Sequence, residues 1–98
     1  MLIDIKHNGA TSTILLNGRL DTTTAPELER VIKNDIDNVE NLVLDFKDLV
    51  YISSAGLRVL LFAQKKMKQV GAMKLINVSE IIMEVFDITG FSDILTIE

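Results

Sequence analysis

The sequence predicts a small α/β domain whose mixed, mostly parallel sheet has about five strands, in the order β-β-α-β-α-β-α-β. Its 98 residues allow one hydrophobic core, so we expect residues 1–98 to form a single domain. Short apolar runs typical of strands alternate with segments of helical spacing. The turn pair Asn8-Gly9 separates the first two strands, whereas helices separate the later ones. Helical connections imply parallel pairing through right-handed crossovers.

Alternating and short apolar segments mark the predicted strands. The strands are placed at residues 2–7, 12–17, 42–46, 73–77 and 94–97. The first two are expected to pair antiparallel, and Gly18 is expected to close the second. The run Leu42–Phe46 is almost continuously apolar, which is typical of a strand covered on both faces in a parallel sheet. The last segment has only a weak strand pattern.

Capping residues mark the predicted helices. The helices are placed from Thr24 to about residues 34–37, from 54 to 69, and from 79 to 88. Thr24 and Ser79 are expected N-caps, and Pro26 lies in a first turn, where no amide donor is lost. Gly71 and Gly90 are expected to end the second and third helices.

Composition excludes several classes of function. Ten Lys and Arg residues against 14 Asp and Glu residues give a net charge of −4, which disfavours binding to nucleic acid. Without cysteine, disulfides, thiolate catalysis and cysteine-ligated zinc are excluded, and one histidine, His7, makes no multi-histidine metal site. The longest apolar run, Val59–Ala63, is far shorter than the about 20 residues of a membrane span. We therefore expect a cytoplasmic protein without catalytic activity, metal or cofactor, and no signal peptide is visible.

Two adjacent serines, Ser53 and Ser54, lie where a strand and loop give way to the second helix. A helix N-terminus offers unpaired N–H groups and partial positive charge, which favour a phosphate on serine. Serine is also a common N-cap, and position alone favours capping. A hydrolase is disfavoured because Ile52 replaces the first glycine of the G-x-S-x-G elbow. His7, the only candidate base, lies in the first strand.

The polar stretch Gly18–Thr24 follows the second predicted strand. Its aspartate, Asp21, is a candidate neighbour of a phosphate or a magnesium ligand, although such a residue more often ties down its own loop through backbone N–H groups. In the predicted topology, the loops after the second and third strands open at the same edge of the sheet. We therefore expect Asp21 to lie close to Ser54.

Phe62 lies in the middle of the polar face on a wheel of the second helix, near Arg58, Lys65 and Lys66. The wheel places the core on another arc, formed by Val59, Leu60, Ala63, Met67 and Val70. Phe62 is either a lone exposed residue covered by lysine stems or an aromatic anchor for a partner. We expect it to be substantially exposed and to contact a partner together with Arg58.

Several segments together resemble the STAS domain, the family shared by sulphate transporters and bacterial anti-sigma factor antagonists. They are Gly18–Thr22, the strand Leu42–Phe46 with Leu49, the stretch Tyr51–Leu60 and the ending Val85–Phe91. The resemblance covers essentially the whole chain.

The resemblance implies a binding protein controlled by phosphorylation. In that family the unphosphorylated antagonist binds an anti-sigma factor that is also a serine kinase, and the sigma factor is released. Phosphorylation abolishes the complex, and a PP2C-type phosphatase restores it. The family's acceptor lies two residues before the glycine that matches Gly56, which implies Ser54, with Ser53 as second choice.

The other site assignments accompany that acceptor. Asp21 and Thr22 are expected beside it, and Ser53, Ser54, Arg58 and Phe62 are expected to contact the partner. This chain departs from the family in two places: it has Ser53 where many phosphorylated members carry Asp, and Ala55 where Ser or Thr is common. The alternative is a structural STAS subunit of a transport or sensory assembly, in which the serine only caps a helix.

Overall fold

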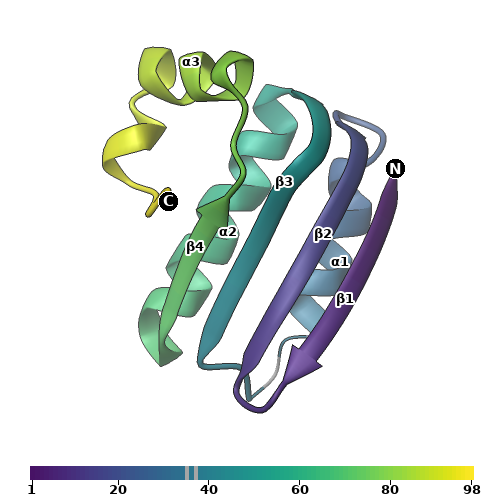
Figure 1. Cartoon of the computed structure of the whole chain (residues 1–98), viewed down its shortest axis with the longest axis vertical. Coiled ribbons are helices and arrows are strands. Elements are labelled where there is room, and N and C mark those ends of the chain that lie inside the picture. Colours follow the sequence, from purple (N-terminus) through teal and green to yellow (C-terminus); the bar gives the residue numbers. More distant parts are fainter. Residues whose placement is uncertain (35, 37) are drawn as a thin grey trace.

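The computed structural model describes residues 1–34, 36 and 38–98. Within these residues the chain forms one four-stranded sheet and three α-helices (Figure 1). The strands are β1 (Leu2–Asn8), β2 (Thr11–Leu20), β3 (Asn41–Ile52) and β4 (Ala72–Ile76). The helices are α1 (Ala25–Asn34), α2 (Ser54–Val70) and α3 (Glu80–Thr89), followed by a 3-10 turn, η1 (Phe91–Asp93). The expected fading of the first helix at Asp35 and Asp37 lies outside the described residues.

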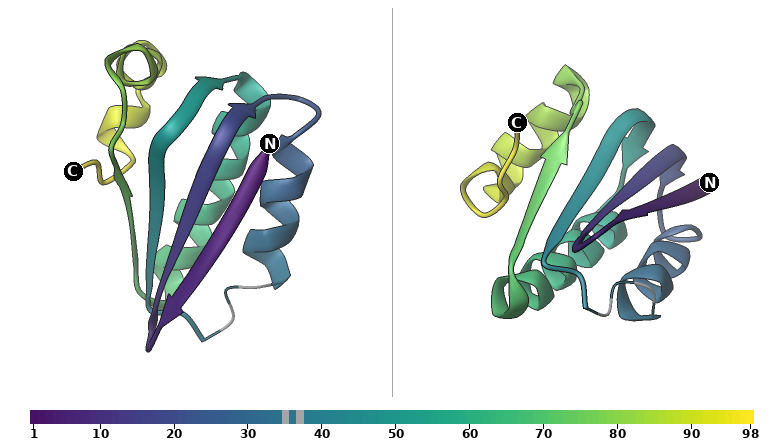
Figure 2. Two further views of the ribbon diagram at one scale, coloured as in Figure 1. Left: turned by 45° about the vertical axis from the view of Figure 1, so that its right-hand side comes forward. Right: turned by 60° about the horizontal axis from the view of Figure 1, so that its bottom comes forward.

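The strands lie in the spatial order β1-β2-β3-β4, which confirms the predicted fold class. A two-residue turn at Gly9 and Ala10 joins β1 to β2, which pair antiparallel. β2–β3 and β3–β4 pair parallel. Each crossover moves one strand in the same direction, so right-handed connections place α1 and α2 on the same face of the sheet (Figure 2).

Two strands extend further than the sequence predicts. β2 continues past Gly18 to Leu20, and β3 continues from Phe46 to Ile52. Two register shifts, between Leu15 and Asn17 and at Gly18, keep these strands paired. These shifts explain why apolar and polar residues stop alternating along the two strands. Where the pairing register shifts, the side chains that follow change the face of the sheet on which they lie.

The expected last strand is only a bridge. Ile97 pairs in parallel with Leu75, whose amide donates to the Thr96 carbonyl at 2.9 Å and whose carbonyl accepts from the Glu98 amide at 2.9 Å. The C-terminal segment is therefore a rudimentary edge beside β4, with too few bonds to count as a strand.

The core lies between the sheet and the pair α1 and α2. Its fully buried members include Ile14, Leu20, Leu28, Ile32, Leu44, Leu60, Ala63 and Met67. Four of the five residues on the expected core arc of α2 are buried, but Val70 is 60% exposed because it is the last residue of the helix. α3 joins the core through Phe86, whose ring centroid lies 6.3 Å from that of Phe46.

Helix caps agree with the sequence at α3 and differ at α1. Ser79 Oγ accepts from the Ile82 amide at 3.3 Å, and Gly90 ends α3 with φ 81°. Thr24 was expected to cap α1, but its hydroxyl donates backwards to the Arg19 carbonyl at 2.6 Å. The Asp21 carbonyl instead accepts from the Ala25 amide, so the first turn is satisfied by backbone groups.

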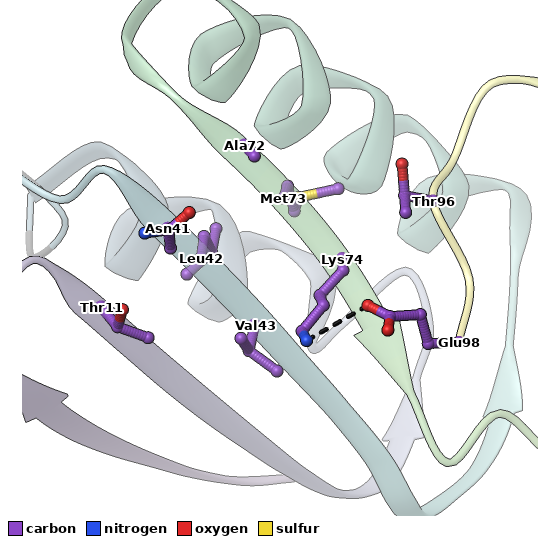
Figure 3. A pocket seen from close by; sticks show the side chains of 9 residues that line it. All are labelled: Thr11, Asn41, Leu42, Val43, Ala72, Met73, Lys74, Thr96 and Glu98. Atoms are coloured by element: carbon purple, nitrogen blue, oxygen red, sulfur yellow. Dashed lines mark ion pairs between the residues drawn. The ribbon is translucent and has the colours of Figure 1, made fainter.

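The face of the sheet opposite α1 and α2 is largely open. Between β3, β4 and the C-terminal segment it holds a groove of about 380 Å³. Thr11 and Val43 line the groove. The Lys74–Glu98 ion pair, at 3.1 Å, joins β4 to the C-terminal segment beside it (Figure 3). No helix in the described part of the chain combines the length and apolar character needed to cross a membrane.

Candidate functional site

The two serines at the start of α2 have different environments. Ser53 is the N-cap: its backbone is extended, and its Oγ accepts from the Gly56 amide at 3.4 Å. Ser53 is half-buried, whereas Ser54 is the first helical residue and is exposed. The Ser54 hydroxyl makes no hydrogen bond to any residue in the described part of the chain. The structure therefore distinguishes Ser53, which caps the helix, from Ser54, whose side chain is exposed.

Gly56 explains how the first turn of α2 sits so close to the sheet. A Cβ at this position would lie 2.8 Å from Leu20 Cγ and 2.9 Å from Ile52 Cγ1. Neither contact is tolerable without movement of buried side chains. The glycine therefore lets the helix start pack directly on the ends of β2 and β3, which fixes the position of Ser54.

Asp21 ties down the loop between β2 and α1. Its Oδ1 accepts from the Thr23 amide at 3.0 Å, the Thr23 hydroxyl at 2.8 Å and the Thr24 amide at 3.1 Å. The Thr23 hydroxyl, followed by the Thr24 and Thr23 amides, lowers the pKa of the Asp21 carboxyl, while its partial desolvation acts in the opposite direction. This geometry is that of a loop tether. Among the described residues no group of three His, Cys, Asp or Glu side chains could hold a metal ion.

The structure brings the loop of Asp21 next to the start of α2. The Ser53 amide donates to the Leu20 carbonyl at 2.9 Å, so the residue before Asp21 contacts the residue before Ser54. Both loops lie at the same edge of the sheet (Figure 1). A shallow groove of about 330 Å³ beside them is lined by Thr22, Ala25, Pro26, Glu29, Ala55, Arg58 and Val59. The structure thus brings Thr22 of the β2–α1 loop and the first turns of α2 to one groove between α1 and α2.

Arg19, Val50 and Tyr51 form an exposed patch at this edge that the sequence does not predict. The Arg19 guanidinium lies 4.1 Å from the centroid of the Tyr51 ring, and Arg19 Nε lies 3.8 Å from Asp21 Oδ2. Val50 is 67% exposed and Tyr51 40% exposed. The sequence places the end of this strand at Phe46, but β3 continues to Ile52, and the exposed pair between buried Leu49 and Ile52 offers apolar surface at the strand end.

Phe62 is half-buried. The prediction that it is substantially exposed is therefore wrong in degree. α1 packs against this side of α2, and Lys33 Nζ lies 5.6 Å from the centroid of the Phe62 ring. Lys66 is likewise not simply solvated: its Nζ donates to the Ile32 carbonyl at 2.9 Å and to the Lys33 carbonyl at 3.2 Å. The polar face of α2 is therefore partly a contact with the end of α1.

His7 lies far from the two serines. Its Nδ1 is 2.6 Å from Ser12 Oγ, near the hairpin turn. Ser12 pairs with Leu42 at the beginning of β3, whereas Leu20 pairs with Ile52 at its end. His7 and Ser54 therefore occupy opposite ends of the sheet, and His7 cannot act as a base for Ser54.

The family model described as "STAS domain" matches residues 3–98. The chain therefore belongs to the STAS domain family. It is 34% identical over 96 residues to the anti-sigma-B factor antagonist of Bacillus subtilis strain 168, which covers 97% of this chain and 88% of the relative.

Solved structures show the same fold. An anti-sigma factor antagonist from Mycobacterium paratuberculosis is similar with a TM-score of 0.87 at 22% identity, covering 98% of this chain and 83% of that one. The anti-sigma factor antagonist SpoIIAA in its unphosphorylated form gives a TM-score of 0.73 at 19% identity, covering 99% and 87%. Its phosphorylated form, solved as a Bacillus cell fate determinant, gives 0.69 at 20% identity, covering 99% and 91%.

Proposed function

We propose that this protein is an anti-sigma factor antagonist that is switched off by phosphorylation of Ser54. In the unphosphorylated form it binds an anti-sigma factor that is also a serine kinase, and the sigma factor is released. Membership of the STAS family and 34% identity to an anti-sigma-B factor antagonist support the binding role. The observation that carries the switch is the exposed Ser54 hydroxyl on a rigidly placed first turn of α2.

Ser54 is the better acceptor because Ser53 already has a structural task. Modification of Ser53 would require its cap bond with the Gly56 amide to break at a residue that is half-buried. Many phosphorylated members of the family carry aspartate where this chain has Ser53. Because serine and aspartate are both strong N-caps, Ser53 keeps the helix cap but lacks the negative charge of the aspartate. The similar protein SpoIIAA has been solved in both phosphorylation states, which supports a switch of this kind.

The energetics of a phosphate at this position are sufficient for a switch. A phosphoserine carries about −1.5 to −2 charges near neutral pH. Enclosing that charge in a close interface costs several kcal/mol unless it is paired, and each ~1.4 kcal/mol is a tenfold change in affinity. One modification can therefore dissociate the complex without any change in the fold.

The partner surface is centred on the carboxyl edge of the sheet. Thr22, Ser54 and Arg58 are exposed there, and Tyr51 with Val50 adds apolar area. Phe62 lies two turns further along α2, and its exposed edge is a second contact. Phe62→Ala should weaken binding by about 1 kcal/mol or more. Because Phe62 also packs on the core, the free energy of unfolding of the Phe62→Ala variant must be measured alongside its binding.

The remaining participants follow from the switch. A PP2C-type phosphatase would remove the phosphate and restore binding. The cycle places the protein in the cytoplasm, where sigma factors act. In the alternative function, a structural STAS subunit of a larger assembly, the cap bond of Ser53 would be the only task of this serine pair.

Phosphate mapping after incubation with the cognate anti-sigma kinase and ATP distinguishes these functions. Wild-type protein should incorporate phosphate at Ser54. Ser54→Ala should keep partner binding and incorporate none, whereas Ser54→Asp should bind weakly. Phosphate on Ser53 alone would show that the acceptor is misassigned. Absence of both phosphate incorporation and kinase binding would favour the structural subunit.

A further inference from the structure

Arg58 lies one helical turn after Ser54 on α2, and both residues are exposed. Side chains at positions i and i+4 of a helix lie on the same face, with Cβ atoms ~5–6 Å apart. Glu29 of α1 lines the same groove as Arg58, but no ion pair joins Arg58 to any residue in the described part of the chain. Its guanidinium is therefore available to a new anion within reach.

A phosphate on Ser54 would be such an anion, in a favourable arrangement. An acidic group placed four residues before a basic one is the better orientation for an i,i+4 pair. Phosphate oxygens and the planar guanidinium fork form two parallel charge-assisted hydrogen bonds. The unmodified serine hydroxyl carries no charge and offers no comparable partner, so the pair exists only after modification.

We propose that Arg58 binds the phosphate on Ser54, so that phosphorylation alters two groups of the partner surface at once. Position 54 gains negative charge, and the guanidinium of Arg58 is withdrawn from the groove between α1 and α2. A partner that meets Arg58 with an acidic side chain loses this contact in the same step. The inference rests on the proposed function, because it concerns the form of the protein that carries phosphate on Ser54. In that form Arg58 is a positioning residue.

Among the charged residues described near Ser54, Arg58 is the cation that can bind the phosphate. Asp21 on the adjacent loop and Glu29 on α1 are negative and repel a phosphate. Arg19 is the other cation at this edge, but its guanidinium stacks on Tyr51 and faces the Asp21 carboxylate. Recruiting Arg19 to the phosphate would break both of these contacts.

The test uses the 98-residue chain with phosphoserine incorporated at position 54 during translation, so that no kinase is needed. The second pKa of the phosphate, ordinarily about 6, is read from a phosphorus NMR titration. Arg58→Ala should raise it by about 0.2–0.4 pH unit, the size expected of an exposed i,i+4 pair. Lys65→Ala, an exposed cation on the same helix, should leave it unchanged. An Arg58→Ala titration that superimposes on the parent curve overturns the proposal.

Partner affinity provides the second readout. The ratio of the dissociation constants of the phosphorylated and unphosphorylated proteins should be about 1.4–2.3-fold smaller in the Arg58→Ala background. An unchanged ratio contradicts withdrawal of the guanidinium. The two proposals fail separately: a kinase that ignores Ser54 removes the proposed function but leaves the NMR result intact. A flat titration removes the role of Arg58 and leaves the switch standing.

Discussion

Replacing Ser53 by alanine removes the oxygen that accepts from the Gly56 amide and leaves the first turn of α2 without its side-chain cap. Loss of an N-cap costs ~0.5–2 kcal/mol. The 3.4 Å separation is at the long end for a hydrogen bond, so we expect about 1 kcal/mol. In a domain of this size that corresponds to a fall of about 4–8 °C in Tm.

Ser54→Ala is the matched control for this prediction. Its side chain is exposed and unbonded among the described residues, so the free energy of unfolding should change by less than about 0.5 kcal/mol. Urea and thermal unfolding followed by circular dichroism measure both variants, and Ser53→Asp should restore the cap. Equal destabilisation by the two alanine variants, or a larger loss at Ser54, would refute the division of the serine pair into a cap and an acceptor.

Three further substitutions test the surroundings of the site. Gly56→Ala should destabilise the fold by about 1–3 kcal/mol in urea unfolding, because its Cβ overlaps Leu20; an unchanged midpoint would contradict the close approach. Lys66→Met should lower the free energy of unfolding by about 1 kcal/mol, since its ammonium caps the last carbonyls of α1, whereas Lys65→Met should have little effect. Asp21→Ala should be less stable than wild type at neutral pH. Because the folded pKa of Asp21 lies below the ordinary 3.8, this difference should persist above pH 3.8 and vanish as the pH falls through the folded pKa; a difference independent of pH would argue against a charged tether.

Features set by local chemistry were predictable from the sequence. The turn at Gly9, the Ser79 cap and the Gly90 helix end each depend on a few neighbouring residues. The crossover rule then placed the loop of Asp21 and the start of α2 at the same edge without any side-chain information. The meeting of these two loops is the part of the candidate site that the sequence predicts well.

Features set by tertiary packing were not predictable in the same way. The ends of β2 and β3 read as loop because Gly18 and the polar Lys47 and Asp48 interrupt the alternation, and only pairing between the strands reveals the shifts in register. The wheel of α2 shows which residues share a face, but it does not show that α1 covers Phe62.

The central claim is that phosphate on Ser54 switches partner binding off. The direct measurement is calorimetric titration of the cognate anti-sigma kinase with the unmodified chain and with the chain carrying phosphoserine at position 54. We predict a tight complex for the unmodified chain and an affinity at least about 100-fold weaker for the phosphorylated one, because taking a phosphate out of water at a close interface costs several kcal/mol. Equal affinities of the two forms would contradict the account.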